Sequence, residues 1–362
     1  MRTWWRGRRL YAIGAAVVVV AAGVAVPVTL AESEEPCWSA PESVTRLVGD
    51  PGAATEALDP GEDLSRLDSV RKLLVHTSLC DPQDLGRVIE SATIPAAGKP
   101  RTTAQARAAY AAAAAYDEQS DVPGGLEPFL ARLLADYVVD AARAEDVVTD
   151  RPGGPTSPDD DTWFEQYDHP QEPHAAFAYR QFGEGPELKW LVGRLARDPK
   201  AFALLYDAER AYFAHCLERF DPRRLLIDEQ VTKKEAPRKV LDYDVRWSLS
   251  YAADRIGGLM QDRVDSARRG EIEDLAAFDR AVRGHLKGTY EPAPDRIRTR
   301  PVMGDIARRP AAGPLRGDVM DGRHQLLPVL ETWAASHDVP DELVARMRLL
   351  VDENYVRGMA VW

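Results

Sequence analysis

The first thirty residues constrain this chain more than any other feature. Four arginines and no acid precede a long apolar run, and three glutamates come shortly after it. A basic flank before an apolar segment keeps the amino terminus in the cytoplasm and directs the chain beyond that segment across the membrane. We therefore expect residues 1–31 to be an N-terminal transmembrane anchor or a signal sequence. The bulk of the chain is then extracytoplasmic.

Two interpretations of this segment stay open. Over residues 10–31 the apolar stretch would rise about 33 Å as a helix, enough to cross a hydrocarbon core of about 30 Å. Over residues 12–26 it has the length of a secretory signal, with Pro27 ending the helix before an imperfect cleavage site. Trp4 and Trp5 lie where an interfacial aromatic belt is expected. This favours a single-pass signal-anchor that binds the membrane through residues 10–31, and a secreted protein is the alternative.

The composition of the 362 residues is that of a globular protein, with 45% hydrophobic and 29% charged residues. The formal net charge of −12 leaves no basic excess that could follow a phosphate backbone, so nucleic acid is not an expected partner. Lysines are few compared with arginines, and Asn354 is the only asparagine. This bias is typical of a GC-rich genome and favours a bacterial source.

Three cysteines indicate how the exported part is stabilised. Outside the cytoplasm, paired thiols tend to oxidise. Cys37 lies in a proline-bounded stretch and Cys80 ends a helical pattern, so both can move to meet each other, whereas Cys216 lies on the apolar stripe of a helix around residues 202–220. We predict a disulfide between Cys37 and Cys80 and a buried free thiol at Cys216. The bridge closes a loop of 43 residues, worth about 4 kcal/mol in the chain-entropy model.

Helical periodicity dominates the remaining chain, and strand alternation is hard to find. The fold class we expect is all-α, a multi-helix ectodomain. One stripe runs from Leu126 to Val148, with charged residues on its other side, and a second long helix covers residues 241–264 with Gly257-Gly258 as a close-packing point or a bend. Thr102 and Gln105 predict a capping box before an alanine-rich helix. Shorter helices are expected at residues 64–79, 85–92, 186–197, 273–286, 325–336 and 342–355.

The helices divide at a stretch rich in proline, glycine and acid, residues 151–162. We expect one helical lobe over residues 32–150 and another over residues 163–362, with one continuous all-α domain as the alternative. A second irregular stretch, residues 291–314, carries many arginines and is too long for a simple turn. These arginines either balance charge within an acidic ectodomain, which we favour, or meet an anionic wall polymer or an acidic partner.

The chain contains no HExxH, GxSxG, phosphate-binding lysine loop or GxGxxG motif, and no cofactor is predicted. The strongest candidate cluster is Asp168, His169, Glu172 and His174, four residues that could bind a divalent metal or form a general acid–base pair. Prolines interrupt the cluster, so it lacks the fixed spacing of a metal site. A rigid surface loop with solvated acids is the interpretation we favour.

Taken together, the sequence predicts a membrane-anchored, extracytoplasmic protein of the bacterial cell envelope. Its helical part is a non-catalytic binding or scaffold module, with an envelope protein or an anionic wall polymer as partner. The alternative is a secreted, metal-assisted hydrolase that acts on an envelope polymer through Asp168, His169, Glu172 and His174.

Overall fold

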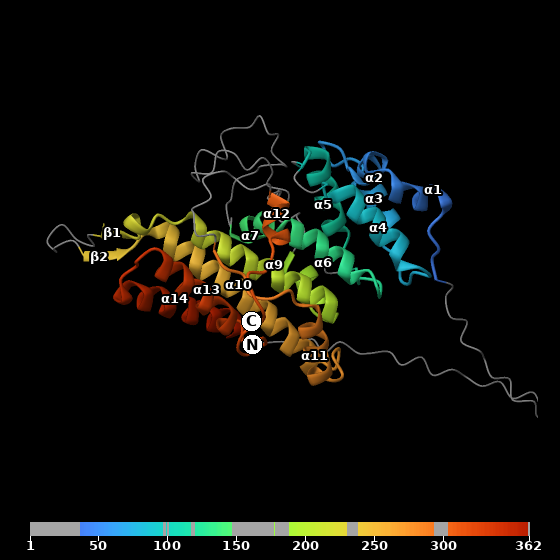
Figure 1. The fold of residues 1–362 in the computed structure, drawn as a ribbon. Helices are drawn as coiled ribbons and strands as arrows, with labels where there is room; N and C mark the ends of the chain where they lie inside the picture. Colours follow the sequence, from blue (N-terminus) through green and yellow to red (C-terminus); the bar gives the residue numbers. More distant parts are fainter. Residues whose placement is uncertain are drawn as a thin grey trace, which may run out of the picture. The chain divides into compact units, whose positions relative to one another are not determined.

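Apolar residues recur at helical spacing along most of the chain, and the computed structural model is accordingly built from α-helices (Figure 1). It describes residues 37–96, 99, 101–116, 120–146, 177, 188–229, 238–292 and 303–360. Within these ranges it contains fourteen α-helices and one two-stranded sheet. The all-α prediction is confirmed for this part of the chain.

The first seven helices form the N-terminal part of the fold. In chain order they are α1 (Glu42–Thr45), α2 (Pro51–Leu58), α3 (Leu67–Leu74), α4 (Pro82–Thr93), α5 (Thr103–Ala115), α6 (Glu127–Asp136) and α7 (Val138–Asp146). A short 3₁₀ turn, Arg46–Gly49, comes after α1. The helix predicted at residues 64–79 is therefore shorter than expected, because Val75 takes an extended conformation and ends α3.

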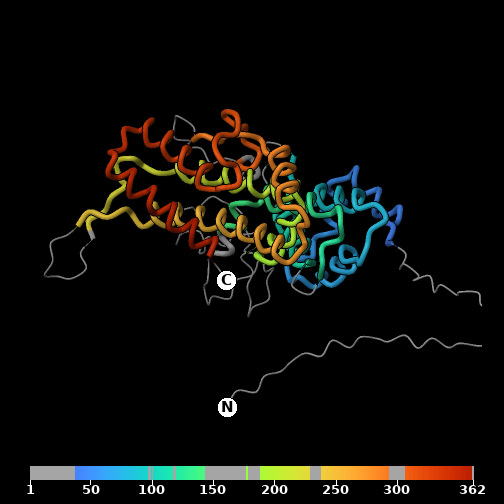
Figure 2. Tube along the Cα trace, turned by 90° about the horizontal axis from the view of Figure 1, so that it is seen from below, coloured from blue at the N-terminus to red at the C-terminus, as the bar shows by residue number. Residues whose placement is uncertain are grey.

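The later elements form the C-terminal part. They are α8 (Leu188–Leu195), α9 (Pro199–Arg219), β1 (Leu226–Glu229), β2 (Arg238–Leu241), α10 (Tyr243–Arg268), α11 (Leu275–His285), α12 (Met303–Arg308), α13 (Arg323–Ser336) and α14 (Asp341–Ala360). A 3₁₀ turn, Pro222–Arg224, lies between α9 and β1. Helices α2–α5 pack on one another, α6 packs on α9, and α10, α13 and α14 lie on the far side of α9 (Figure 2).

The alanine-rich helix α5 forms as its sequence predicts. The Thr102 hydroxyl accepts a hydrogen bond from the Gln105 backbone N–H, and the Gln105 side chain accepts one from the Thr102 N–H, both at 3.1 Å. This is the predicted capping box. The small side chains let α2, α3 and α4 pack directly against the helix, and all its alanines except Ala104 are buried.

The stripe from Leu126 to Val148 does not form one helix, which corrects the sequence prediction. The helix ends at Asp136 and begins again at Val138, because the Arg101 guanidinium takes the Asp136 carbonyl oxygen that a continuous helix would bond internally. Arg101 also donates to Asp140 at 2.6 Å, and its guanidinium lies over the Tyr137 ring. Asp136 and Asp140, predicted on the polar side, are buried.

Helices α10 and α14 pack closely through glycines. A Cβ added at Gly257 would collide with the Tyr355 carbonyl oxygen, and one added at Gly358 would collide with the Asp254 carbonyl oxygen. Helix α10 continues through Gly257 and Gly258 without interruption. Of the two interpretations of this glycine pair, the close-packing point is confirmed for Gly257, whereas a Cβ at Gly258 would meet nothing within 4 Å.

Two elements were not expected from the sequence. Strands β1 and β2 form an antiparallel pair in which Leu226 faces Leu241; each strand is only four residues long, too short for a clear alternation. The second is helix α12, which lies within the stretch 291–314 that we expected to be irregular. An isolated bridge between Thr289 and Gly313 joins the two ends of that stretch.

None of the helices that the structure describes combines the length and the apolar character needed to cross a bilayer. The predicted anchor, residues 1–31, lies outside the described residues, as does the predicted linker, residues 151–162. The division of the helices into two lobes at that linker stays a prediction.

Candidate binding site

The four residues of the strongest predicted cluster, Asp168, His169, Glu172 and His174, lie outside the described residues. Phe177, the nearest described residue, is buried, and its ring centroid lies 5.8 Å from that of Tyr137. Among the described residues, no three or more His, Cys, Asp and Glu side chains converge to hold a metal ion. The metal-assisted alternative depends on residues outside the described chain, so it stays a prediction.

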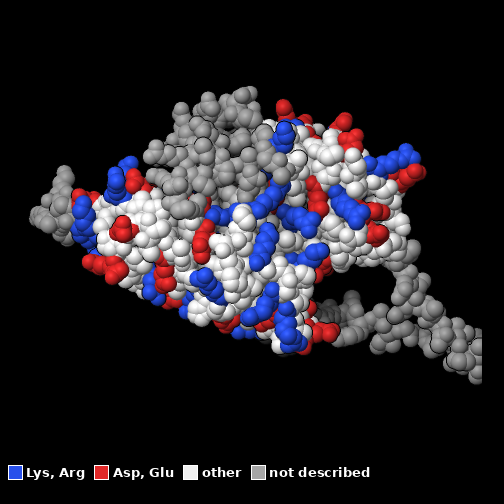
Figure 3. Space-filling model, in the orientation of Figure 1, with Lys and Arg blue, Asp and Glu red and all other residues white. Residues whose placement is uncertain are grey.

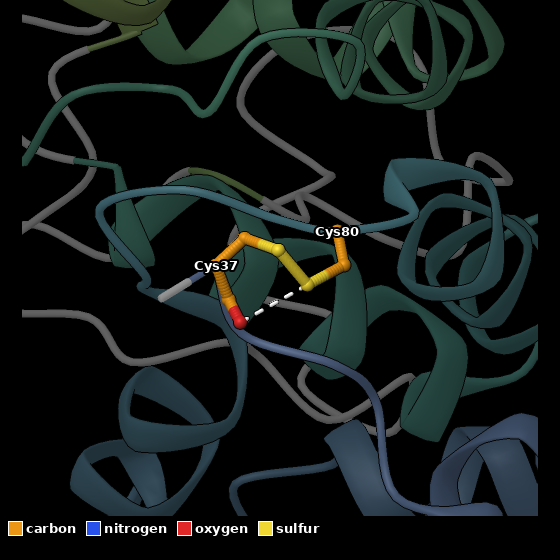
Figure 4. The surroundings of a disulfide bond; sticks show 2 residues. All are labelled: Cys37 and Cys80. Atoms are coloured by element: carbon orange, nitrogen blue, oxygen red, sulfur yellow. Dashed lines mark hydrogen bonds between the residues drawn. A yellow bond between two sulfur atoms is a disulfide. The ribbon is translucent and has the colours of Figure 1, made fainter. Parts of the chain in front are cut away.

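The predicted cysteine pair is confirmed. Cys37 and Cys80 form a disulfide with their Cα atoms 5.0 Å apart (Figure 4). Two backbone hydrogen bonds of Trp38 hold the same two segments together. Its N–H donates to the Ser78 carbonyl oxygen at 2.9 Å, and its carbonyl oxygen accepts from the Cys80 N–H at 2.9 Å. The Trp38 ring stacks on His76, with the centroids 3.8 Å apart. The bridge ties the beginning of the described chain to the segment between α3 and α4.

A cavity of about 150 Å³ lies among α6, α7, α8, α9, α10 and the end of α14. An engineered apolar cavity of this size is known to hold a benzene molecule, so the space suits one ring-sized group. Its walls are largely apolar, as expected for a small-molecule site. The apolar lining residues are Leu134, Ala135, Val138, Ala141, Leu188, Val192, Leu205, Ala208 and Leu259.

One side of the cavity carries a buried ion pair. The Arg255 guanidinium on α10 donates to both carboxylate oxygens of Glu209 on α9, at 2.5 to 3.1 Å. Both side chains are less than a tenth exposed. Asp254, which also lines the cavity, accepts from Arg357 at 3.0 Å. Glu209 and Arg255 hold each other in fixed positions, and charged groups fixed in this way can orient the polar end of a ligand.

A second buried network on α9 faces away from the cavity. Arg210 donates to Asp207 at 2.8 Å, to Gln325 at 3.2 Å and to the Gly288 carbonyl. Asp207 also accepts from the Lys287 backbone N–H at 2.9 Å. Burial raises the pKa of the Asp207 carboxyl to about 6, although Arg210 opposes the shift. These bonds join α9 to the segment after α11 and to α13, so the network is structural.

The arginines at the end of the 291–314 stretch balance internal charge. Arg308 donates to Asp136 at 2.8 Å, and Arg309 donates to Glu218 at 2.6 Å. Both carboxylates are buried, and burial raises the pKa of Asp136 although Arg101 and Arg308 oppose the shift. Figure 3 shows basic side chains gathered across the middle of one face, with acidic ones close to them. For Arg308 and Arg309, the favoured interpretation of charge balance is confirmed.

Two further titratable residues on α9, His215 and Cys216, are buried. Burial lowers the pKa of His215, and the Glu218 side chain, 3.7 Å from its ring, opposes this shift. Burial raises the pKa of the Cys216 thiol to about 11, so the thiol stays protonated and unreactive at neutral pH. The prediction of a buried free cysteine is confirmed.

Glu209 and Arg255, the charged pair at the cavity, were not predicted from the sequence. The sequence does contain a signal that Glu209 is buried. Apolar residues occur on every side of α9, so this helix has no fully polar face on which its charged residues could be exposed. The identity of its partner had no such signal, because Arg255 lies 46 residues away on a different helix.

No protein-family model matches the chain, and comparison with curated proteins and with solved structures finds no significant similarity.

Proposed function

We propose that the chain is a membrane-anchored, extracytoplasmic protein of the bacterial cell envelope. Residues 10–31 hold it in the membrane with its amino terminus in the cytoplasm. The helical body is a non-catalytic binding module that recognises another envelope component through the cavity between α8, α9 and α10.

The observation that carries the location is the bridge between Cys37 and Cys80. Disulfides persist in oxidising compartments and are rare in the cytoplasm. The bridge comes soon after the apolar segment in sequence and fastens the chain that would leave the membrane onto the helical body. Such a fastening is useful to a protein attached at one end, since it prevents the first residues from being pulled away from the core.

The binding role is supported by the cavity of about 150 Å³ and its fixed ion pair. An apolar pocket with a few convergent polar groups is the usual form of a ligand site. The internal pairing of Arg308 and Arg309 with Asp136 and Glu218 weakens the case for an anionic polymer as the partner. An envelope protein or an uncharged envelope component fits better.

The location is tested by fusing the carboxyl terminus of the full chain to an enzyme that is active only outside the cytoplasm. We expect an active reporter and a chain that stays in membranes after an alkaline wash. The matched control replaces Val18 and Val19 by arginine, which breaks the apolar run and should leave the fusion inactive in the cytosol. A wild-type fusion that is inactive and soluble in the cytosol would contradict the proposal.

Mass spectrometry of the mature amino terminus then separates the two forms of export. A terminus at Met1 or Arg2 supports the anchor, whereas one at Glu32 shows a cleaved signal and a released protein.

A further inference from the structure

Helix α10 carries two neighbouring glycines, and packing explains only one of them. A Cβ at Gly257 would collide with the Tyr355 carbonyl oxygen on α14, whereas a Cβ at Gly258 would meet nothing within 4 Å. Glycine inside a helix is less stable than alanine, because it loses more backbone entropy on folding. Position 258 therefore lacks a side chain although the fold has room for one.

Gly258 lies in the middle of the α10 face that borders the cavity described above. Successive helix residues are rotated by about 100° from one another, so residues four apart lie on the same face. The residues of α10 that line the cavity are Asp254, Arg255, Gly258, Leu259, Gln261 and Asp262. A side chain at the centre of this face would extend into the cavity, so the glycine keeps the space open.

The size and the walls of the cavity limit what can enter it. Its volume of about 150 Å³ matches one benzene-sized ring. Opposite α10, the walls are aliphatic and come from three helices: Leu134 lies on α6, Leu188 on α8 and Leu205 on α9. Burial of apolar surface against such walls favours a hydrophobic ring over a polar group of the same size.

The charged groups of the lining exclude an ionic ligand. Glu209 is paired with Arg255, and Asp254 accepts a hydrogen bond from Arg357. The other two charged lining residues also have interaction partners, namely Lys189 and Asp262. A ligand ion would have to break one of these interactions or remain unpaired itself, and an unpaired buried charge is strongly destabilising.

A single hydroxyl group on the ring is compatible with this lining. A carboxylate has about four lone-pair sites on its two oxygens, so Glu209 can accept a hydrogen bond from a ligand while it stays bonded to Arg255. Such a bond would orient the ring with its polar substituent toward the ion pair and its apolar edge toward the aliphatic walls.

We infer that the cavity binds a neutral, ring-sized apolar compound with at most one hydrogen-bonding substituent, and that Gly258 keeps the cavity open for it. This inference rests on the proposed binding role and names its ligand class. It does not depend on how the amino terminus is held in the membrane.

The test compares three para-fluorinated rings of similar size: the phenol, which is neutral at neutral pH, the benzoate and the benzylamine. Fluorine NMR measures how each signal broadens when the full chain, purified in detergent, is added. Micelles without protein give the baseline, since they also take up the probes. We expect the phenol to bind at least about tenfold more tightly than either ion.

Variants at position 258 then test the role of the glycine. Gly258→Leu fills the cavity and should weaken binding of the phenol by at least about tenfold. The matched control is Gly284→Leu on α11, which should bind as wild type, since Gly284 is exposed and a Cβ there also meets nothing within 4 Å. Gly258→Ala adds one methyl group, so it should fold at least as well as wild type and still bind the phenol more weakly.

The inference is overturned if the phenol signal broadens no more with the wild-type protein than with empty micelles. It is also overturned if Gly258→Leu binds the phenol as tightly as wild type, or if either ion does so. When the phenol fails, crosslinking in intact cells separates the two proposals. Loss of a crosslink to an envelope component in Gly258→Leu, but not in Gly284→Leu, means that the binding role stands and the ligand class is wrong. Crosslinks that are unchanged in both variants contradict the binding role as well.

Discussion

Helices α5 and α9 are both surrounded by protein, yet they are stabilised in opposite ways. The buried face of α5 consists of alanines and Tyr110. Helix α9 buries Asp207, Glu209, Arg210, His215 and Glu218 together with its aromatic and aliphatic residues. Around α5 most buried contacts are made by small apolar side chains, whereas around α9 buried ion pairs are added to apolar packing.

The two regions should therefore be destabilised by different substitutions. A helix of alanines depends on close approach, because it offers few polar groups that need partners. A helix with buried charges depends on every partner being present, because an unpaired buried charge costs several kcal/mol. The N-terminal region is further secured by the disulfide between Cys37 and Cys80, and the C-terminal region by pairs such as Arg263 with Asp279.

The largest effect is expected from Arg210→Met. This change leaves Asp207 buried without its ion-pair partner, and it should lower the free energy of unfolding by about 3–5 kcal/mol. Urea denaturation measures it. The control, Arg46→Met, removes the exposed pair with Glu42 and should cost under about 1 kcal/mol. Equal losses in the two variants would show that burial of the pair is unimportant.

The N-terminal region is tested by replacing both bridge cysteines with serine. Loss of a cross-link across 43 residues should lower the free energy of unfolding by about 4 kcal/mol. Wild type treated with a reductant should show a similar loss in the same denaturation experiment. A change below about 1 kcal/mol would mean that close packing alone secures this region.

The charge on α9 should also give a pH dependence. The pKa of Asp207 is raised from 3.8 to about 6 in the folded state. The folded protein then binds the proton more tightly than the unfolded chain between pH 4 and 6. This contribution to stability is present below pH 4 and is lost as the pH rises through 6, by about 3 kcal/mol in all. Asp207→Asn should lack this slope when unfolding is measured at each pH, and an unchanged slope would refute the assignment.

The smallest effect concerns the contact between α10 and α14, where the two backbones approach closely at a glycine. Gly257→Ala should lower the free energy of unfolding by about 1–3 kcal/mol, because the added methyl collides with the Tyr355 carbonyl on α14. Gly258→Ala meets nothing nearby and should raise stability by up to about 1 kcal/mol through helix propensity. Thermal unfolding compares them, and the same sign for both would contradict the packing.

Local patterns in the sequence were enough to predict much of the fold. The stripe at residues 241–264 predicted α10, the Thr102–Gln105 spacing predicted the cap of α5, and compartment chemistry predicted the Cys37–Cys80 pair. The first two predictions depend only on residues that are close together in sequence. The third depends on the redox state of the compartment. The glycine pair at residues 257 and 258 predicted either a close-packing point or a bend, and the structure confirms the first for Gly257.

The failures concern partners that are distant in sequence. The break at Tyr137 depends on Arg101, and the burial of Asp136 depends on Arg308, 172 residues away. Hydrophobic periodicity carries no information about partners that are distant in sequence. It therefore predicts the charged residues of the Leu126–Val148 stripe on the solvent side of the helix. The candidate site was missed for the same reason, because Glu209 and Arg255 meet across two helices. The predicted cluster at residues 168–174 lies outside the described residues.

The central claim, an exported body fastened by one disulfide, is tested most directly by thiol labelling in cells. Cells are quenched with acid, free thiols are alkylated under denaturing conditions, and peptides are mapped by mass spectrometry. We predict that Cys37 and Cys80 are recovered as one linked peptide pair and that Cys216 alone is alkylated. Alkylation of Cys37 and Cys80 in most of the protein would show a reducing compartment and contradict the account.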